Sequence, residues 1–377
     1  MQVSVWEKES FYAHSDVLII GSGFVGLWSA YFLLCEDPTL RITIVDRGVI
    51  PAGASTRNAG FACFGSLTEL AHDASLMGED QMLKLVEMRY KGLKRIRKLL
   101  PKKSFDYDTC GGYELISRKA QETPATLSEK IDWLNELLQA VIGKKRVFRQ
   151  EDKKIKSFGF QKVDHLVENR LEGHLHSGKL CQVLLQLVQG SGVTVLPVTE
   201  VLSYEKQRDT FVVATNHGIS LSADQLLVCT NAFARQLLPD LDVQPARGQV
   251  LVTGPVEGLP FKGSFHFDEG FYYFRNLGNR VLLGGARNKA IQEETSYELQ
   301  TTDLIQLELE RYLAACILPG RSYSIEHRWS GIMGMGAEKM PIVQELSPGM
   351  FCAVRMSGMG VALAPVVGEK VSKMMRG

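Results

Sequence analysis

The sequence predicts an α/β fold in which helices flank a parallel sheet and a second domain is inserted into the chain. Three observations predict it: a buried strand, glycine turn and helix at residues 16–35, a second buried strand at residues 41–46, and another strand–glycine–helix unit at residues 351–374. Apolar strands that alternate with helices are typical of parallel sheets. Because long segments of another character separate these units, we expect two domains that are interleaved along the chain.

The glycine turn after the first strand is the most informative segment. Gly21, Gly23 and Gly26 form G-x-G-x-x-G between a buried strand and an apolar helix. In this context Gly21 permits a tight turn, Gly23 lets a pyrophosphate approach the backbone, and Gly26 lets the helix pack closely on the strand. The N-terminus of the helix, at Phe24 and Val25, adds N–H groups and a partial positive charge for the phosphates.

The second strand ends in Asp46, 20 residues after Gly26. An acid at this position accepts hydrogen bonds from the ribose hydroxyls of an adenosine. Asp46 would repel the 2′-phosphate of NADP, although the neighbouring Arg47 weakens this argument. The motif alone leaves both NAD and FAD as cofactors.

The composition sets limits on the class of protein. The chain has 377 residues, 45% of them hydrophobic, and a net charge of +1, which gives no general reason to expect nucleic acid or a membrane as a partner. Seven cysteines without C-x-x-C or metal-ligand spacing favour a reducing compartment and no metal site. With no signal peptide and no run of about 18–20 apolar residues, we expect a cytoplasmic protein without a membrane span. Residues 91–103 predict a helix with a basic, solvated face, and a nucleic-acid patch is the alternative.

Further along, the chain alternates between nucleotide-type blocks and blocks of another character. For the nucleotide-type blocks, the apolar patterns predict a helix at 180–188, a strand at 192–196, a meander at 200–205 and 210–215, and a buried strand at 222–231. Residues 80–165 are helix-rich and charged, and the later block predicts antiparallel strands at 249–253, 270–275 and 280–285, with a turn at 276–279 and a helix at 302–315.

Taken in order, these motifs resemble the D-amino-acid oxidase–like flavoenzymes, which include glycine oxidase, sarcosine oxidase and bacterial D-amino-acid dehydrogenases. The segments that carry the resemblance are 21–46, 53–61, 228–232, 245–250, 272–275 with 284–285, and 358–360. The resemblance implies a Rossmann-like FAD-binding domain made of residues 1–79, 166–244 and 326–377. It also implies an inserted α+β substrate domain, built on an antiparallel sheet, made of residues 80–165 and 245–325.

The same resemblance implies the chemistry and the cofactor contacts. It implies FAD and the oxidation of a C–N bond of an amine or amino acid by hydride transfer to flavin N5, with O₂ or a quinone as the electron acceptor. The loop at residues 53–65 can offer backbone N–H groups to the cofactor, and strand ends are where α/β sheets place ligand contacts. Besides the first glycine turn, Asp46 and Arg47, the residues assigned to FAD are Ser55, Thr56, Asn58, Ala59, Gly60, Phe61, Val201, Thr230, Asn231, Gly331, Gly358, Met359, Gly360, Val361 and Ala362.

The segment after Trp329-Ser330-Gly331 departs from some relatives in two ways. Residues 332–340 contain no cysteine that could tether the flavin, so we expect noncovalent FAD. Residues 332–335 contain no arginine to bind a substrate carboxylate. We therefore expect simple α-amino acids to be poor substrates. Secondary or long-chain amines should be better, as should amino acids whose carboxylate reaches Arg275, Arg287 or Arg328.

Tyr272 and Arg275 are the residues that we assign to catalysis. Strand alternation places Tyr272 and Phe274 on one face of the sheet and Tyr273 and Arg275 on the other. We assign the flavin-facing aromatic to Tyr272 rather than Tyr273, from the family pattern.

Several alternatives stay open at this point. His174 and His176 have the spacing of metal ligands, but no third ligand stands out, so we expect a structural role. The alternative functions are an NAD-dependent dehydrogenase and an FAD-dependent enzyme that acts on a modified tRNA base.

Overall fold

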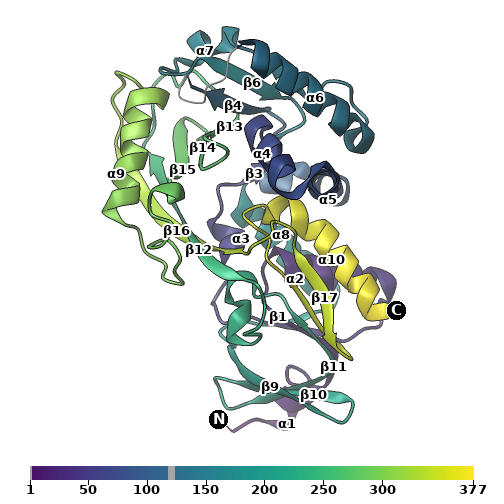
Figure 1. Cartoon of the computed structure of the whole chain (residues 1–377). Coiled ribbons are helices and arrows are strands. Elements are labelled where there is room, and N and C mark those ends of the chain that lie inside the picture. The colour runs from purple at the N-terminus through teal and green to yellow at the C-terminus, as the bar shows by residue number, and fades with distance from the viewer. Residues whose placement is uncertain (1, 118–123) are drawn as a thin grey trace. The chain divides into compact units, whose positions relative to one another are not determined.

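The computed structural model describes residues 2–117 and 124–377, which fall into two compact units (Figure 1). The first unit consists of Met1–Arg57, Ser177–Ala246 and Ile332–Gly377, and the second of Asn58–His176 and Arg247–Gly331. The units are interleaved in sequence, but residues 58–79, 166–176 and 326–331 fall in the second unit rather than in the first, where we expected them, and residues 245–246 fall in the first.

An eight-stranded sheet forms the centre of the first unit. Its main path runs β17 (Ile342–Ser347), β18 (Met350–Val354), β11 (Ser220–Val228), β1 (Ser15–Ile20), β2 (Ile42–Val45) and β8 (Thr194–Leu196), and β10 (Thr210–Thr215) and β9 (Val201–Gln207) extend it from β11. The strands from β18 to β8 are parallel. Five of the six residues of β1 are buried, as expected for a strand in a sheet that is covered on both faces.

The helices of this unit are α1 (Val5–Glu9), α2 (Phe24–Glu36), α3 (Ala54–Arg57), α8 (Ser177–Gly190), α10 (Gly360–Arg376) and the 3₁₀ segment Asn231–Gln236. Helix α10 packs along α2, where a Cβ atom on Gly368 would lie 2.8 Å from Trp28 Cβ. The absence of a side chain at Gly368 therefore sets the spacing of the two helices. Helix α10 begins earlier than the expected Ala364, because the amides of Ala362 and Leu363 both donate to the carbonyl of Met359.

The second unit is built on a mostly antiparallel sheet, as the sequence predicted. The strand order is β16 (Ile325–Met335), β12 (Gln244–Thr253), β15 (Arg280–Gly285), β14 (Tyr272–Leu277), β13 (Ser264–Phe267), β4 (Gly112–Ile116), β6 (His165–Asn169) and β5 (Phe148–Gln150). Strands β14 and β15 form a tight hairpin in which Leu277 pairs with Arg280. Gly278 has a φ of 61° in that turn, a conformation that glycine adopts without steric cost.

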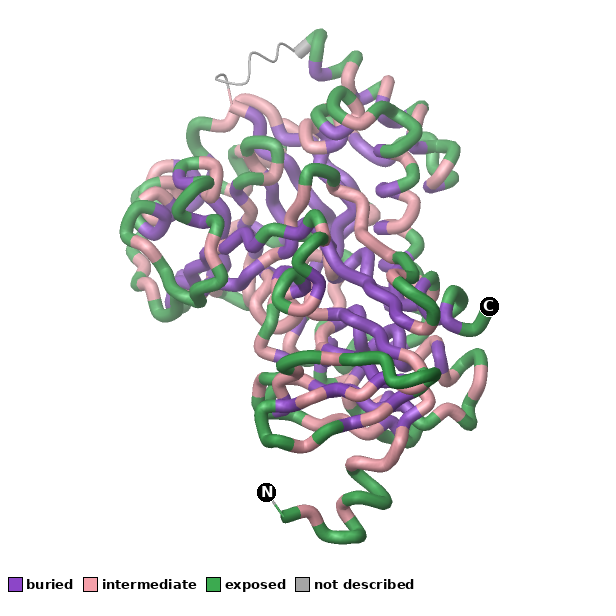
Figure 2. The backbone as a smooth tube through the Cα atoms, turned by 60° about the horizontal axis from the view of Figure 1, so that its bottom comes forward, coloured by how far each residue is buried: buried purple, intermediate pink, exposed green. Residues whose placement is uncertain are grey.

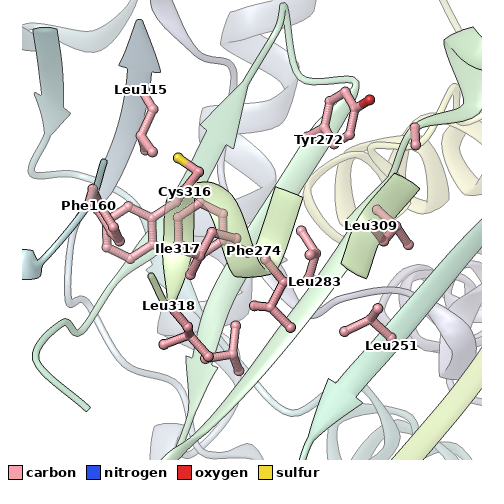
Figure 3. Close-up of a cluster of buried hydrophobic side chains, with 14 of the residues drawn as sticks. Leu115, Phe160, Leu251, Tyr272, Phe274, Leu283, Leu309, Cys316, Ile317 and Leu318 are labelled. Carbon is pink, nitrogen blue, oxygen red and sulfur yellow. The ribbon is translucent and has the colours of Figure 1, made fainter. Parts of the chain in front are cut away.

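Helices and short segments complete the second unit. They are α4 (Leu67–Met77), α5 (Glu79–Leu99), α6 (Pro124–Ile142), α7 (Lys153–Phe158), α9 (Asp303–Tyr312), the π-helical Leu313–Ile317, the 3₁₀ segments Lys102–Phe105 and Arg287–Lys289, and the two-stranded sheet of β3 (Phe61–Ala62) and β7 (Gly173–His174). One face of the large sheet packs against α9 and the π-helical segment in an apolar core that includes Phe265, Phe274 and Leu309 (Figure 3).

Buried polar contacts explain why residues 58–79 belong to the second unit. Strand β3 pairs with β7. The Glu172 carboxylate accepts hydrogen bonds from the amides of Phe64 at 2.8 Å and Gly65 at 3.3 Å, and Glu114 accepts one from the amide of Thr68 at 2.9 Å. The chain after Arg57 is therefore tied to the strands of the second unit.

Burial follows the central strands of both sheets, whereas the edge strands β9 and β17, the loops and the outer helix faces carry most of the exposed residues (Figure 2). All seven cysteines, which lie within the described residues, are free thiols. In the described part of the chain, no helix is both long enough and apolar enough to span a bilayer.

Glu172 makes the stability of the second unit depend on pH. Burial raises the pKa of Glu172 from 4.5 to about 8. The folded state therefore holds a proton that the unfolded state has released between these values, and the free energy of unfolding must fall as pH rises through this window, by on the order of 4 kcal/mol. Glu172→Gln keeps an acceptor oxygen for Phe64 and Gly65, so we expect its thermal unfolding temperature to fall less from pH 5 to 8 than that of the wild type, and to lie above it at pH 8.

Glu168→Gln is the matched control. The pKa of Glu168 is lowered to about 2 by its hydrogen bonds to Lys154, Tyr113 and Arg149, which outweigh the opposing effect of burial. Its stabilisation is complete above the unfolded pKa and is lost only as pH falls toward 2. Glu168→Gln should therefore lower the unfolding temperature by a constant amount from pH 5 to 8. A Glu172→Gln variant whose unfolding temperature changes as much from pH 5 to 8 as that of the wild type does would contradict the assignment of Glu172.

Candidate active site

The glycine turn between β1 and α2 has the geometry that its sequence predicted. Gly21 has a φ of 108°, which only glycine adopts readily. A Cβ atom on Gly26 would lie 2.0 Å from the Gly21 carbonyl oxygen. The helix can approach the strand this closely only because Gly26 has no side chain.

Gly23 is different, because its φ of −69° suits any residue. A Cβ atom built there would meet only Ser55, whose Oγ would lie 3.0 Å away. That hydroxyl accepts a hydrogen bond from the Phe24 amide at 2.9 Å. Gly23 is the N-cap of α2 and has no side chain to cover the first turn of the helix. The backbone N–H groups of that turn are therefore suited to bind an anion.

Asp46 lies at the carboxyl end of β2 and is tied to the same turn. Its Oδ2 accepts hydrogen bonds from the amide of Ser22 at 2.8 Å and from the hydroxyl of Ser22 at 2.7 Å, and its Oδ1 accepts one from the amide of Gly48 at 2.9 Å. These bonds fix the carboxylate beside the glycine turn. The neighbouring Arg47 lies 3.9 Å over the ring of Phe233.

Two buried hydroxyls at the carboxyl ends of β11 and β18 have no hydrogen-bond partner among the described residues. They are Thr230 Oγ1 and Ser357 Oγ. Buried polar atoms are nearly always paired, so these two fit a ligand that supplies the missing partners. Both follow parallel strands at the sheet edge where α/β folds bind cofactors.

The loops that carry these hydroxyls are conformationally strained. Asn231, Arg355 and Ser357 have φ values of 46°, 63° and 46°, which non-glycine residues rarely adopt. The loops hold each other: Asn231 Oδ1 accepts a hydrogen bond from the Met356 amide at 3.2 Å, and Arg355 binds Asp242. Strain maintained by such contacts is typical of functional sites.

The other residues assigned to FAD are spread over both units. Ser55 and Thr56 belong to the first unit, and residues 58–61 belong to the second. Val201 begins β9, Gly331 lies on β16, and residues 358–362 form the turn that leads into α10. Their contacts with a cofactor stay predictions.

The face of the large sheet opposite its main apolar core, which we call the polar face, carries buried polar side chains beside a smaller apolar cluster that includes Val250 and Leu282. Directly paired residues of neighbouring strands point to the same face, and the pairs Tyr273–His266 and Arg275–Ser264 join β14 to β13. His266 in turn pairs with Glu114 on β4. The Phe61 ring packs against this face, with its centroid 5.1 Å from that of His266 and 5.8 Å from that of Tyr273.

Arg275 is the charged residue of this face that stands out. It is 4% exposed, and its Nε has no hydrogen-bond partner among the described residues. Nor does any carboxylate of those residues form an ion pair with its guanidinium. Burial lowers the pKa of Arg275 to about 10, so it stays charged at neutral pH.

The assignment of Tyr272 as the flavin-facing aromatic stays a prediction, and the position of Tyr272 in the structure argues against it. Tyr272 lies in the apolar core (Figure 3), where its ring contacts Tyr312 and its hydroxyl donates to Glu308 at 2.8 Å. The alternation of side chains along β14 was predicted correctly. The face that carries Tyr272 and Phe274, however, is the apolar face that α9 covers. Tyr273, on the polar face with Arg275, is the better candidate.

Sequence reasoning gave no role to His266 and Glu114, which the strand pairing places on the polar face. The alternation that pairs Tyr273 with Arg275 also places His266 beside them, once the register of β13 is known. Among the other arginines considered, Arg328 is occupied by Glu310 at 2.7 Å and Gln306 at 2.6 Å. Of the three arginines considered, Arg275 is the buried one, and it has no ion-pair partner among the described residues.

Comparison with known proteins decides the family. The model of the FAD dependent oxidoreductase family, DAO, matches residues 16–374. This protein belongs to that family. The probable oxidoreductase OrdL of Rhizobium meliloti is 24% identical over 374 residues, which cover 96% of this chain and 83% of that protein.

Solved structures share the fold. Glycine oxidase from Geobacillus kaustophilus superposes with a TM-score of 0.78 at 17% identity, covering 96% of this chain and 95% of that one. L-Proline dehydrogenase from P. horikoshii gives a TM-score of 0.76 at 17% identity, covering 96% and 93%. Membership of the FAD-dependent oxidoreductase family argues against the NAD-dependent alternative. The open helix N-terminus and the two unpaired hydroxyls suit FAD.

Substitution of the glycines should separate cofactor binding from folding. Gly23→Ala meets only a side-chain hydroxyl and needs no unusual φ, so we expect a folded protein that has lost FAD because the new methyl group blocks the pyrophosphate. Gly26→Ala places a methyl group against a backbone carbonyl, and this variant should lose stability and soluble yield. The flavin-to-protein absorbance ratio and far-ultraviolet circular dichroism check the two outcomes. Full flavin content in Gly23→Ala would contradict the predicted position of the pyrophosphate.

Proposed function

We propose that this protein oxidises a C–N bond of an amine or amino acid that carries a carboxylate, in a reaction that depends on FAD. When bound, FAD supplies the acceptor for the hydride that leaves the substrate carbon, at flavin N5. The observation that carries the proposal is the buried, unpaired guanidinium of Arg275. The names of structural neighbours, glycine oxidase and L-proline dehydrogenase, support an amino compound as the substrate.

A buried cation without a counter-ion is unfavourable, and a bound anion removes that cost. An arginine without its partner destabilises the folded state by several kcal/mol, and a carboxylate can form two parallel hydrogen bonds with it. Arg275 thereby supplies the carboxylate site that residues 332–335 lack. Of the substrate classes that we expected, this favours amino acids whose carboxylate binds an arginine outside residues 332–335.

The neighbours of Arg275 suit a neutral amine. Burial lowers the pKa of His266 and raises that of Tyr273 to about 12, so both side chains are uncharged at neutral pH. Burial also raises the pKa of Glu114 to about 7. The uncharged His266 and Tyr273 do not hold a proton on the substrate nitrogen, and an amine must be neutral to release hydride from its carbon. We propose that Arg275 orients the substrate while this face excludes water.

Flavin reduction should depend on the substrate carboxylate. We expect the flavin-loaded protein, mixed anaerobically with D-, L- and N-methyl amino acids and with their decarboxylated amines, to bleach at least tenfold faster with one of the acids. Arg275→Met removes the guanidinium and should abolish this preference, with a loss of roughly a hundredfold for the acid. Replacing an unpaired buried charge by an apolar chain should not lower stability.

Arg287→Met is the control. It removes another arginine of the same sheet region that we considered as the partner of the substrate carboxylate. It should keep the preference for the acid. If Arg275→Met bleaches as fast as the wild type with every acid, Arg275 does not bind the carboxylate. If amines always outperform acids, the proposed substrate class is wrong.

We also propose that FAD is held without a covalent bond, because residues 332–340 contain no cysteine. Acid precipitation should release all of the flavin into the supernatant, where its absorbance can be measured. Yellow colour that stays with the washed pellet would contradict this proposal.

A further inference from the structure

Asp108, Cys110 and His174 form a compact group of potential metal ligands in the second unit. One ligand atom from each residue lies within 4.8 Å of the other two. Cys110 Sγ lies 3.3 Å from His174 Nδ1. In the described residues, no other group of three such side chains meets this criterion.

The backbone fixes this group in place. Asp108 and His174 face each other across an isolated β-bridge, in which the Asp108 amide donates to the His174 carbonyl at 2.8 Å and the His174 amide donates back at 2.9 Å. The next contact, from the Gly111 amide to the Glu172 carbonyl at 3.1 Å, holds Cys110 between two anchored positions. A Cβ atom on Gly173 would lie 1.9 Å from the Asp108 carbonyl oxygen, so only glycine allows this approach.

We infer that Asp108, Cys110 and His174 bind a divalent cation of the zinc class, with the fourth position open. Zinc–ligand bonds of about 2.0–2.3 Å in a tetrahedral arrangement separate the ligand atoms by roughly 3.5 Å. The observed separations, 3.3 Å for the sulfur–nitrogen pair and at most 4.8 Å for the group, are close to this value. A thiolate and an imidazole select zinc over magnesium or calcium. The cation site does not require the proposed amine oxidation, but the charge of Arg275 acts on both Cys110 and His174 and opposes a bound cation.

Lys262 competes with the metal for Asp108. Its ammonium lies 2.7 Å from Asp108 Oδ2, and its side chain is 63% exposed. An exposed lysine can move into water at little cost, which frees the carboxylate. Metal binding displaces the thiol proton of Cys110, so the thiolate and carboxylate together balance the charge of the cation.

Zinc titration of the flavin-loaded protein by isothermal calorimetry should show one tight site. Cys110→Ser and His174→Gln each remove a ligand, so we expect roughly a hundredfold weaker binding or none. Cys35→Ser removes an exposed cysteine of the first unit and should leave zinc binding unchanged. With Cd²⁺ as the probe, the thiolate-to-metal absorption band in the ultraviolet should appear in the wild type and in Cys35→Ser but not in Cys110→Ser.

Lys262→Met provides a test that does not rely on altering a ligand. It removes the competing cation from an exposed position, so zinc should bind at least severalfold more tightly. Unchanged affinity in Lys262→Met, or a cadmium–thiolate band that persists in Cys110→Ser, would overturn the site.

Discussion

The close contact between helix α2 and the start of its own glycine turn is the constraint on which the first unit depends. With no side chain at Gly26, the helix lies against the Gly21 carbonyl, and its N-terminus is directed along the end of β1. Asp46 and Ser55 are both tied to this arrangement through short polar contacts. The absence of one side chain therefore brings together the open N-terminus of α2, the Asp46 carboxylate and the Ser55 hydroxyl.

In the second unit, the two faces of the large sheet carry different kinds of side chain. The face beneath α9 is filled by aromatic and aliphatic side chains, whereas the opposite face combines a smaller apolar cluster with buried polar groups. The opposite face keeps a buried arginine without a partner, a histidine with an unpaired nitrogen and a carboxylate whose pKa is raised. A protein can retain such unfavourable groups only if packing elsewhere offsets them.

Local patterns predicted the parts of the structure that local forces decide. The strand, turn and helix at residues 16–35, the hairpin at residues 270–285 and the roles of Gly21 and Gly26 follow from spacing alone. The features that the sequence did not predict depend on contacts between residues far apart in the chain. The face that α9 covers determined that Tyr272 is a core residue, and the contacts of Glu172 moved residues 58–79 to the second unit. In the same way, the group around His174 combines residues 64 positions apart.

The interleaving of the two units has a consequence for how the chain is made. The central strand β1 pairs with β11, which in turn pairs with β18 near the end of the chain. The apolar side of α2 is covered by α10, which is far from it in sequence. During synthesis, which adds about 5–20 residues per second, the first unit must wait with an open sheet edge and an uncovered helix until residues 350–376 have left the ribosome. Loss of residues 360–376 would therefore leave the nascent protein prone to aggregation rather than merely shortened.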